Sequence, residues 1–260
     1  MAESQQFFVA GVLHLPPLPG APACKQGFQA VLDHAIRDAD ALVAGGIRAV
    51  VIENFGDAPF FASSVPPHVS AMMAVVGSRV RAMFDDLGIN VLRNDGHAAL
   101  GVAAAVQADF VRVNVFTGAA WTDQGLIQGQ AAELTRYRSL LGQQATAIMA
   151  DVKVKHAVPA GTSCIETLAR EAIGRGGADG LIVTGSGTGH STDLDDVRRV
   201  KDVAGNRPVW VGSGTTPETI GAIRDCADGV IVGTVLHRKG DIQAPIDVDR
   251  VRSITEQMGA

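Results

Sequence analysis

Two glycine-bearing turns near the end of the chain decide the fold. They are Val211-Gly212-Ser213-Gly214-Thr215-Thr216-Pro217-Glu218 and, further on, Asp228-Gly229-Val230-Ile231-Val232-Gly233-Thr234. Each is a short apolar strand that runs into Gly with Ser or Thr and then into a helix start. Such a turn points free backbone N–H groups at one place, and the helix dipole adds positive potential there.

Paired turns of this kind predict a phosphate site. In a (β/α)₈ barrel the turns after the seventh and eighth strands hold a phosphorylated substrate. We therefore expect a phosphate or another anion to be bound by five residues of these turns: Gly212, Ser213, Gly214, Gly233 and Thr234. The alternative is that Gly at a helix start only relieves backbone strain.

Length and composition agree with one α/β domain. The chain has 260 residues, of which 47% are hydrophobic, so a single (β/α)₈ TIM barrel can span residues 1–260. The net charge is −5, and the chain contains no block of like charges. It therefore lacks the clustered Lys and Arg that binding to nucleic acid requires. We expect no nucleic-acid partner.

Cysteine usage and hydropathy indicate a cytoplasmic protein. Cys24, Cys164 and Cys226 are an odd number at wide spacing, which fits neither a disulfide framework nor a zinc site. The first residues lack a basic region ahead of an apolar stretch, and no apolar run approaches the roughly 18 residues of a membrane span. Neither secretion nor a transmembrane segment is expected.

Short apolar runs rich in β-forming residues recur along the chain and predict eight strands. They lie near 7–13, 47–53, 89–93, 109–115, 145–152, 179–184, 207–212 and 228–232. Helical periodicity between them predicts helices over 28–43, 65–87, 124–141, 164–175, 194–203 and 217–224. Strict alternation implies parallel strands with helices outside. A doubly wound open sheet is the alternative, but eight units that end in paired phosphate turns favour a closed barrel.

Two strands show which side chains face the barrel interior. Successive residues of a strand point to opposite faces, so Arg112 and Asn114 oppose the valines around them. By the same alternation, Asp151, Lys153 and Lys155 oppose an apolar set that should face the helices. Charges inside a barrel are costly unless they pair with one another or with substrate.

Polar residues gather where the predicted strands end. They are His14; Glu53, Asn54 and Asp57; Arg93, Asn94 and Asp95; Arg112 and Asn114; and Asp151, Lys153, Lys155 and His156. A barrel needs no charge at this rim for its stability, whereas active sites lie there. We expect His14, Asn54, Arg93, Arg112, Asn114 and Lys155 to bind substrate.

Four rim residues are candidates for catalysis: Glu53, Asp95, Asp151 and Lys153. Lys153 or Lys155 would act as a base or Schiff-base amine if its pKa were lowered, or would stay cationic and stabilise an enolate or phosphate. Asp151 on the same face favours the electrostatic role. The three carboxylates would serve as general acid or base, would hold a divalent cation such as Mg²⁺, or would only pair with the arginines.

Two further loops extend the candidate site. The segment 117–125 contains Trp121 and precedes a predicted helix, so it is either a lid over the site or an ordinary helix entry with Asp123 as the cap. The turn Thr184-Gly185-Ser186-Gly187-Thr188-Gly189-His190 is a third loop of Gly, Ser and Thr. We expect Ser186 and Gly187 to join the phosphate site.

The chain resembles the BtpA/SgcQ family over nearly all of its length. The similarity lies in Val12-Leu13-His14-Leu15-Pro16-Pro17-Leu18-Pro19-Gly20, Glu53-Asn54-Phe55-Gly56-Asp57-Ala58-Pro59-Phe60, Asn90-Val91-Leu92-Arg93-Asn94-Asp95, Arg112-Val113-Asn114-Val115, Thr122-Asp123-Gln124-Gly125, Ala150-Asp151-Val152-Lys153-Val154-Lys155-His156-Ala157 and the late glycine turns. The resemblance implies a TIM barrel like those that bind ribulose phosphates. It also implies kinship with a protein type associated with photosystem I biogenesis and with sugar-uptake and sugar-catabolism proteins.

Two functions follow from the residues and the resemblance. The first is a cytoplasmic enzyme that acts on a small phosphorylated sugar or phosphoribosyl compound by isomerisation, carbon–carbon or glycosidic bond chemistry. The second is a non-catalytic biogenesis or assembly factor for a membrane complex of the photosystem I kind, which should show an exposed apolar patch. The charged rim favours the enzyme. Barrels of this size often dimerise, so a homodimer is the expected assembly.

Overall fold

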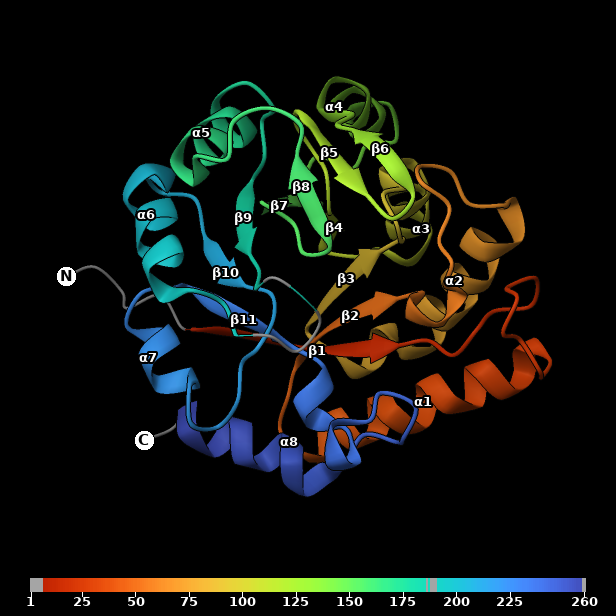
Figure 1. Cartoon of the computed structure of the whole chain (residues 1–260). Coiled ribbons are helices and arrows are strands. Elements are labelled where there is room, and N and C mark those ends of the chain that lie inside the picture. Colours follow the sequence, from red (N-terminus) through yellow and green to blue (C-terminus); the bar gives the residue numbers. More distant parts are fainter. Residues whose placement is uncertain (1–6, 186, 188–190, 259–260) are drawn as a thin grey trace.

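Eight parallel strands close into a barrel in the computed structural model (Figure 1). The structure describes residues 7–185, 187 and 191–258. The hydrogen-bonded order is β1-β11-β10-β9-β7-β4-β3-β2, and β1 pairs with both β2 and β11. The strands are β1 (Phe8–His14), β2 (Ala49–Glu53), β3 (Asp86–Asn90), β4 (Phe110–Val113), β7 (Ala147–Val152), β9 (Gly180–Val183), β10 (Val209–Val211) and β11 (Gly229–Val232). The predicted closed barrel is confirmed, and the open sheet is wrong.

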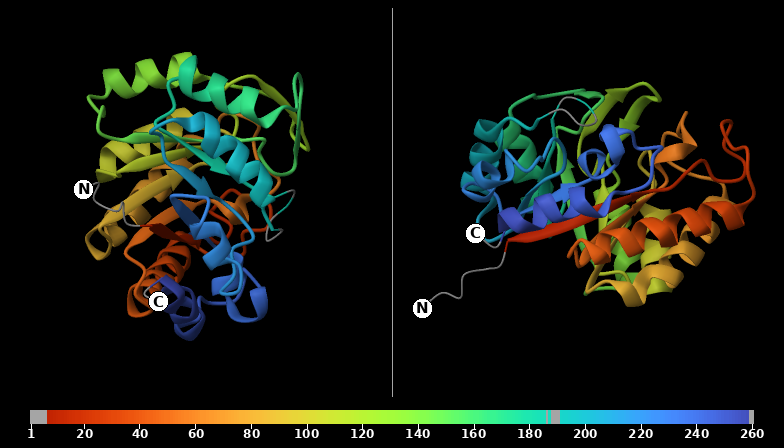
Figure 2. Two further views of the ribbon diagram at one scale, coloured as in Figure 1. Left: turned by 90° about the vertical axis from the view of Figure 1, so that its left-hand side faces the viewer. Right: turned by 90° about the horizontal axis from the view of Figure 1, so that it is seen from below.

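Helices surround the barrel, as Figures 1 and 2 show. They are α1 (Phe28–Ala44), α2 (Pro67–Val80), α3 (Gly96–Val106), α4 (Ala131–Leu140), α5 (Ile165–Gly174), α6 (Leu194–Ala204), α7 (Ile220–Arg224) and α8 (Val248–Thr255). Short 3₁₀ turns η1 (Phe55–Asp57), η2 (Arg81–Met83), η3 (Thr234–Leu236), η4 (Arg238–Gly240) and η5 (Glu256–Met258) complete the set. Among the described residues, no helix is both long and apolar enough to cross a membrane.

Several predicted boundaries are wrong. The third strand begins at Asp86, three residues earlier than predicted, because the helix before it ends at Val80 rather than running to residue 87. The segment 124–141 is only partly helical, since a strand occupies its first residues. Helix α7 begins at Ile220 rather than at 217 and has only five residues, so a helix dipole contributes less to the late glycine turns than the sequence predicts.

A small antiparallel sheet lies beyond the ends of β4 and β7. Its strands, β5 (Ala119–Thr122), β6 (Gly125–Gln128) and β8 (Ala157–Pro159), have the order β6-β5-β8. The helix-entry interpretation of residues 117–125 is therefore wrong: the segment forms a hairpin, and Gln130 rather than Asp123 precedes α4. That the hairpin closes over the site as a lid stays a prediction.

Apolar side chains fill the amino-terminal half of the barrel interior. This cluster contains Ala10, Val12, Ala49, Val51, Phe110, Met149, Ile182, Trp210 and Ile231. Phe8 stacks on Trp210 with the ring centroids 4.3 Å apart, and Phe110 meets the same indole edge-on at 5.2 Å. The larger cluster, which includes Val111, lies between strands and helices. On β4, Phe110 points into the barrel interior and Val111 points toward the helices. Arg112, two residues after Phe110, therefore lies on the interior face, as predicted.

Replacing Gly88 with alanine should lower the free energy of unfolding by about 1–3 kcal/mol, because overpacking forces neighbouring side chains to shift. The added Cβ would overlap the ring atoms Cε2 and Cζ of Phe110. Chemical denaturation followed by circular dichroism measures the change. The control is Gly174→Ala at the end of α5, where nothing lies within 4 Å of the added atom. Equal loss in both variants would contradict this packing.

Candidate functional site

A buried ion pair forms the floor of the site. Arg112 on β4 donates from Nε to Oδ1 of Asp151 at 2.9 Å and from Nη2 to Oδ2 at 3.0 Å, across to the neighbouring strand β7. Asn114 donates to the same Oδ2 at 2.8 Å, and Asn90 donates to the Asn114 side-chain oxygen at 3.1 Å. Burial acts to lower the pKa of Arg112, but attraction and hydrogen bonding to Asp151 outweigh it and raise that pKa. Arg112 is therefore a permanent cation.

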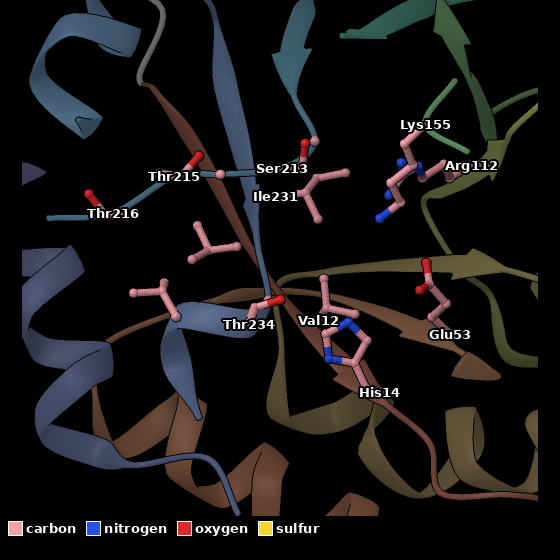
Figure 3. A pocket seen from close by; sticks show the side chains of 15 residues that line it. Val12, His14, Glu53, Arg112, Lys155, Ser213, Thr215, Thr216, Ile231 and Thr234 are labelled. Carbon is pink, nitrogen blue, oxygen red and sulfur yellow. The ribbon is translucent and has the colours of Figure 1, made fainter. Parts of the chain in front are cut away.

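Above this pair lies a cavity of about 140 Å³ (Figure 3), which we call the phosphate pocket after the ligand expected from the sequence. Both late glycine turns line it, together with four charged or titratable side chains from β1, β2, β4 and the segment after β7. The lining residues are Val12, His14, Glu53, Arg112, Lys155, Gly212, Ser213, Gly214, Thr215, Thr216, Ile231, Val232, Gly233, Thr234 and Val235. All five residues expected in the two late turns thus lie in one pocket with His14, Glu53, Arg112 and Lys155.

The two turns present unsatisfied hydrogen-bond donors to the pocket. The Thr215 side chain is 3% exposed, and its Oγ1 has no hydrogen-bond partner among the described residues. Within the same part of the chain, the backbone N–H groups of Gly214, Thr215, Thr234 and Val235 donate to no other residue. Buried donors without partners are costly, so this arrangement is typical of a site that an acceptor-rich ligand completes.

Ser213 lines the phosphate pocket and also holds its turn in place. Its Oγ accepts a hydrogen bond from the Gly185 backbone N–H at 2.7 Å, and its carbonyl accepts one from Thr192 at 3.0 Å. It therefore fixes the turn after β10 against the loop after β9. Of the two residues expected from that loop, Gly187 is buried but does not line the phosphate pocket, and Ser186 lies outside the described residues.

Lys155, not Lys153, is the lysine of the phosphate pocket. Strand β7 ends at Val152, and Lys153 has a left-handed backbone with φ of 56°, so the alternation of faces stops there. Lys153 is exposed, and its Nζ lies 3.7 Å from Oδ2 of Asp196 on α6. The expectation that Lys153 faces the interior beside Asp151 is therefore wrong in its geometry.

The backbone holds Lys155 in place. Its N–H donates to Thr184 Oγ1 at 3.2 Å, and its carbonyl accepts from Nη2 of Arg93 at 2.6 Å. The Nζ atom forms no hydrogen bond or ion pair with the described residues. Burial and then the charge of Arg112 lower the pKa of Lys155, and Glu53 opposes this shift.

A pair of histidines sets the proton position on His14. The Nδ1 of His237 lies 2.7 Å from the Ala244 carbonyl oxygen and must donate to it, which leaves Nε2 of His237 as an acceptor. That Nε2 lies 3.4 Å from Nδ1 of His14, so His14 donates from Nδ1. Its Nε2 is then unprotonated and turned toward the pocket (Figure 3). Burial, followed by the charges of His237, Lys155 and Arg112, lowers the pKa of His14 to about 3.

Two expected site residues, Asp95 and Asn54, instead hold loops together. Asp95 caps α3 by accepting from the Ala98 N–H at 2.8 Å and also accepts from the Val65 N–H at 2.8 Å. Asn54 accepts from the Leu92 N–H at 2.7 Å and donates to Asp57 at 3.0 Å. The carboxylates of Glu53, Asp95 and Asp151 have separate surroundings, and no group of three potential metal-binding side chains occurs in the described ranges.

A second hollow of about 320 Å³ adjoins the phosphate pocket. Glu53 and Lys155 line both cavities, so the two meet at these side chains. The remaining walls of the second hollow are Phe55, Phe60, Leu92, Arg93, Asn114, Asp123 and His156. Arg93 and Asn114, expected to bind substrate, therefore lie on this side and not with the glycine turns.

Two residues of the site were not predicted from the sequence. Thr215 lies in the glycine turn after β10, yet nothing in the sequence distinguishes its buried hydroxyl from that of Thr216. His237 follows the last strand in a segment without periodicity, and only the folded chain brings it to His14, 223 positions away.

The low pKa of His14 predicts a pH dependence of stability. An unfolded His binds a proton below about pH 6.5, whereas folded His14 stays neutral down to about pH 3. The unfolded state then binds more protons, so the free energy of unfolding falls as the pH drops below 6.5. This single group contributes a slope of at most about 1.4 kcal/mol per pH unit.

His14→Gln should flatten that slope, and urea denaturation between pH 7 and 5 measures it. His68→Gln, at an exposed position, is the control. An unchanged slope in His14→Gln would contradict a buried neutral imidazole.

Comparison with known proteins identifies relatives over the full chain. The model of the family described as "BtpA family" matches residues 5–260. A protein of Synechocystis sp. named "Photosystem I biogenesis protein BtpA" is 45% identical over 251 residues, which cover 96% of this chain and 87% of that protein.

Solved structures of low identity share the fold. One described as "Native KDPGal structure" has a TM-score of 0.60 at 14% identity and covers 99% of this chain and 97% of its own. A phosphoribosyl anthranilate isomerase from Thermus thermophilus has a TM-score of 0.55 at 10% identity, with 97% and 98% covered. At such identities the likeness concerns the barrel and not the reaction.

Proposed function

Since the chain belongs to the BtpA family and folds into a (β/α)₈ barrel, we propose that it is a cytoplasmic enzyme acting on a small phosphorylated sugar or phosphoribosyl compound. The observation that supports this most is the composition of the phosphate pocket. Unsatisfied donors of two turns, among them the buried hydroxyl of Thr215, face the same cavity as Lys155 and Arg112.

The groups that line the pocket favour an anionic ligand. Arg112 and Lys155 line it, whereas Asp151, which pairs with Arg112 through two hydrogen bonds, does not. Lys155 has no carboxylate within ion-pair distance among the described residues, and Glu53 is the one carboxylate of the lining. Two cations and one carboxylate thus face the pocket, and a phosphate bound by the turn N–H groups would accept the donors that the protein leaves free.

The remaining groups have roles that fit a sugar attached to that phosphate. The unprotonated Nε2 of His14 accepts a hydrogen bond and therefore suits a hydroxyl group of the ligand. Glu53 lies where the two cavities meet and is placed to exchange a proton with the part of the ligand that enters the second hollow. Arg93 and Asn114 would orient that part. These roles suit isomerisation, carbon–carbon or glycosidic bond chemistry.

A second candidate function is an assembly factor for a membrane complex. Its support is the name of the Synechocystis relative and one surface feature of this chain. Trp121 on β5 lies opposite Leu126 on β6 and Val158 on β8, and all three side chains are exposed on one face of the small sheet. Under this alternative, substitutions in that strip would impair function, and substitutions in the phosphate pocket would not.

The proposal predicts that phosphorylated sugars stabilise the protein. A ligand at about 100 times its dissociation constant adds about 2.7 kcal/mol of apparent stability. We expect a thermal-shift screen of sugar phosphates, with and without Mg²⁺, to show such a rise for at least one compound and none for its unphosphorylated counterpart. No shift with any phosphorylated compound would remove the support for the enzyme and favour the assembly factor.

Thr215→Val should separate binding from folding. Valine keeps the shape of threonine, and the hydroxyl has no partner in the unliganded chain, so the stability without ligand should be unchanged or slightly higher. The loss of one hydrogen bond to a charged phosphate should weaken binding by about 1.5–3 kcal/mol, that is, roughly tenfold or more. Isothermal titration measures this. Thr135→Val on α4, away from the pocket, is the control, and equal affinity in both variants would argue against a phosphate at this turn.

A further inference from the structure

Lys155 differs from every other lysine of this chain. The sequence contains five lysines, and Lys153 and Lys201 are paired with Asp196 and Asp228. Lys25 and Lys239 are exposed. Lys155 is the lysine that lines the phosphate pocket, and it has no ion-pair partner among the described residues.

Resting on the proposed function, we propose that Lys155 forms a Schiff base with the carbonyl carbon of a phosphorylated aldose or ketose. The phosphate would be held by the two glycine turns. A compound anchored there must pass Lys155 to enter the second hollow, because Lys155 and Glu53 are the side chains that the two cavities share. A carbonyl a few bonds from the phosphate would therefore lie beside the amine.

The surroundings of Lys155 favour a reactive amine. A lysine becomes nucleophilic when burial or a neighbouring cation makes its neutral form accessible. The neighbouring cation here is Arg112, which Asp151 keeps charged at all relevant pH values. Both effects shift the pKa of Lys155 downward. Lys153, which has Asp196 beside it and lies in solvent, has neither advantage.

The backbone fixes the amine for attack. The N–H and carbonyl of Lys155 are both hydrogen-bonded, to Thr184 and Arg93. These bonds attach the segment to the loops after β9 and β3, so the stem of the side chain starts from a defined point although the strand has already ended. Positioning of this kind supplies part of the rate advantage of an intramolecular reaction.

The step balances without any co-reactant. Starting from the ammonium form, Lys155 first loses one proton, and the neutral amine then forms a nitrogen–carbon bond as the carbonyl π bond breaks. Two of the three ammonium protons pass to the carbonyl oxygen, which leaves as water, and the positive charge stays on nitrogen. Glu53 and the unprotonated Nε2 of His14 border the same cavity and would accept and return these protons.

Reductive trapping tests the proposal. The protein is incubated briefly with dihydroxyacetone phosphate or ribulose 5-phosphate, treated with sodium borohydride, and analysed by intact mass and peptide mapping. We expect one reduced adduct per chain, located on Lys155, and a decrease of that adduct when inorganic phosphate competes. Adducts spread over Lys25, Lys153 or Lys239 would overturn the proposal.

Two variants provide a matched comparison. Lys155→Arg keeps the positive charge but removes the nucleophile, so it should lose the adduct, while Lys153→Arg should retain it in full. If Lys155→Arg fails to fold, peptide mapping of the reduced adduct in the unaltered protein still shows whether the adduct lies on Lys155. If a compound raises the melting temperature but gives no adduct, the Schiff base is wrong and the phosphosugar function stands. If neither compound gives a shift or an adduct, the Schiff base is wrong, and the broader screen decides the function.

Discussion

The buried pair of Arg112 and Asp151 is the constraint on which the rest of the site depends. Charges inside a barrel are tolerated only when they are paired and fully hydrogen-bonded, and removal of one partner of such a pair typically costs about 3–5 kcal/mol. Here the two oxygens of Asp151 accept three hydrogen bonds from Arg112 and Asn114. The pair joins β4 to β7 and separates the apolar interior around Trp210 from the polar rim.

This pair also determines the chemistry above it. Because Arg112 stays charged, any amine placed next to it is pushed toward its neutral form, and any phosphate nearby is attracted. Lys155 and the turns after β10 and β11 occupy those two positions. The neutral pair His14 and His237 adds an acceptor instead of a third cation. The pocket thus combines free hydrogen-bond donors with a proton acceptor, and the proposed phosphosugar function rests on this combination.

The fold could be predicted from the sequence because its signals are periodic and local. Apolar strands and the paired glycine turns indicated the closed barrel, and both turns line one cavity at its carboxyl-terminal end. The helix α3 lacked such a signal, because small apolar residues occupy it almost throughout and leave no polar face. The hairpin of β5 and β6 was missed because its short strands adjoin a helical segment.

The site was predictable in composition but not in detail. The alternation of side chains between the two faces of a strand correctly predicted that Arg112, Asn114 and Asp151 point into the barrel, since all three lie on or next to regular strands. It failed at Lys153, where a positive φ turns the chain and no sequence signal marks the change. Asp95 shows a second limit. A carboxylate after a strand suits catalysis and helix capping equally, and only the Ala98 N–H at 2.8 Å identifies the cap.

The decisive experiment is a crystal structure of the protein with a bound sugar phosphate. We expect the phosphate to lie within hydrogen-bond distance of the Thr215 hydroxyl and the N–H groups of Gly214 and Thr234. The sugar should extend past Lys155 toward Arg93. A phosphate bound elsewhere on the barrel, or an empty pocket at a saturating concentration of a compound that stabilises the protein, would contradict this expectation.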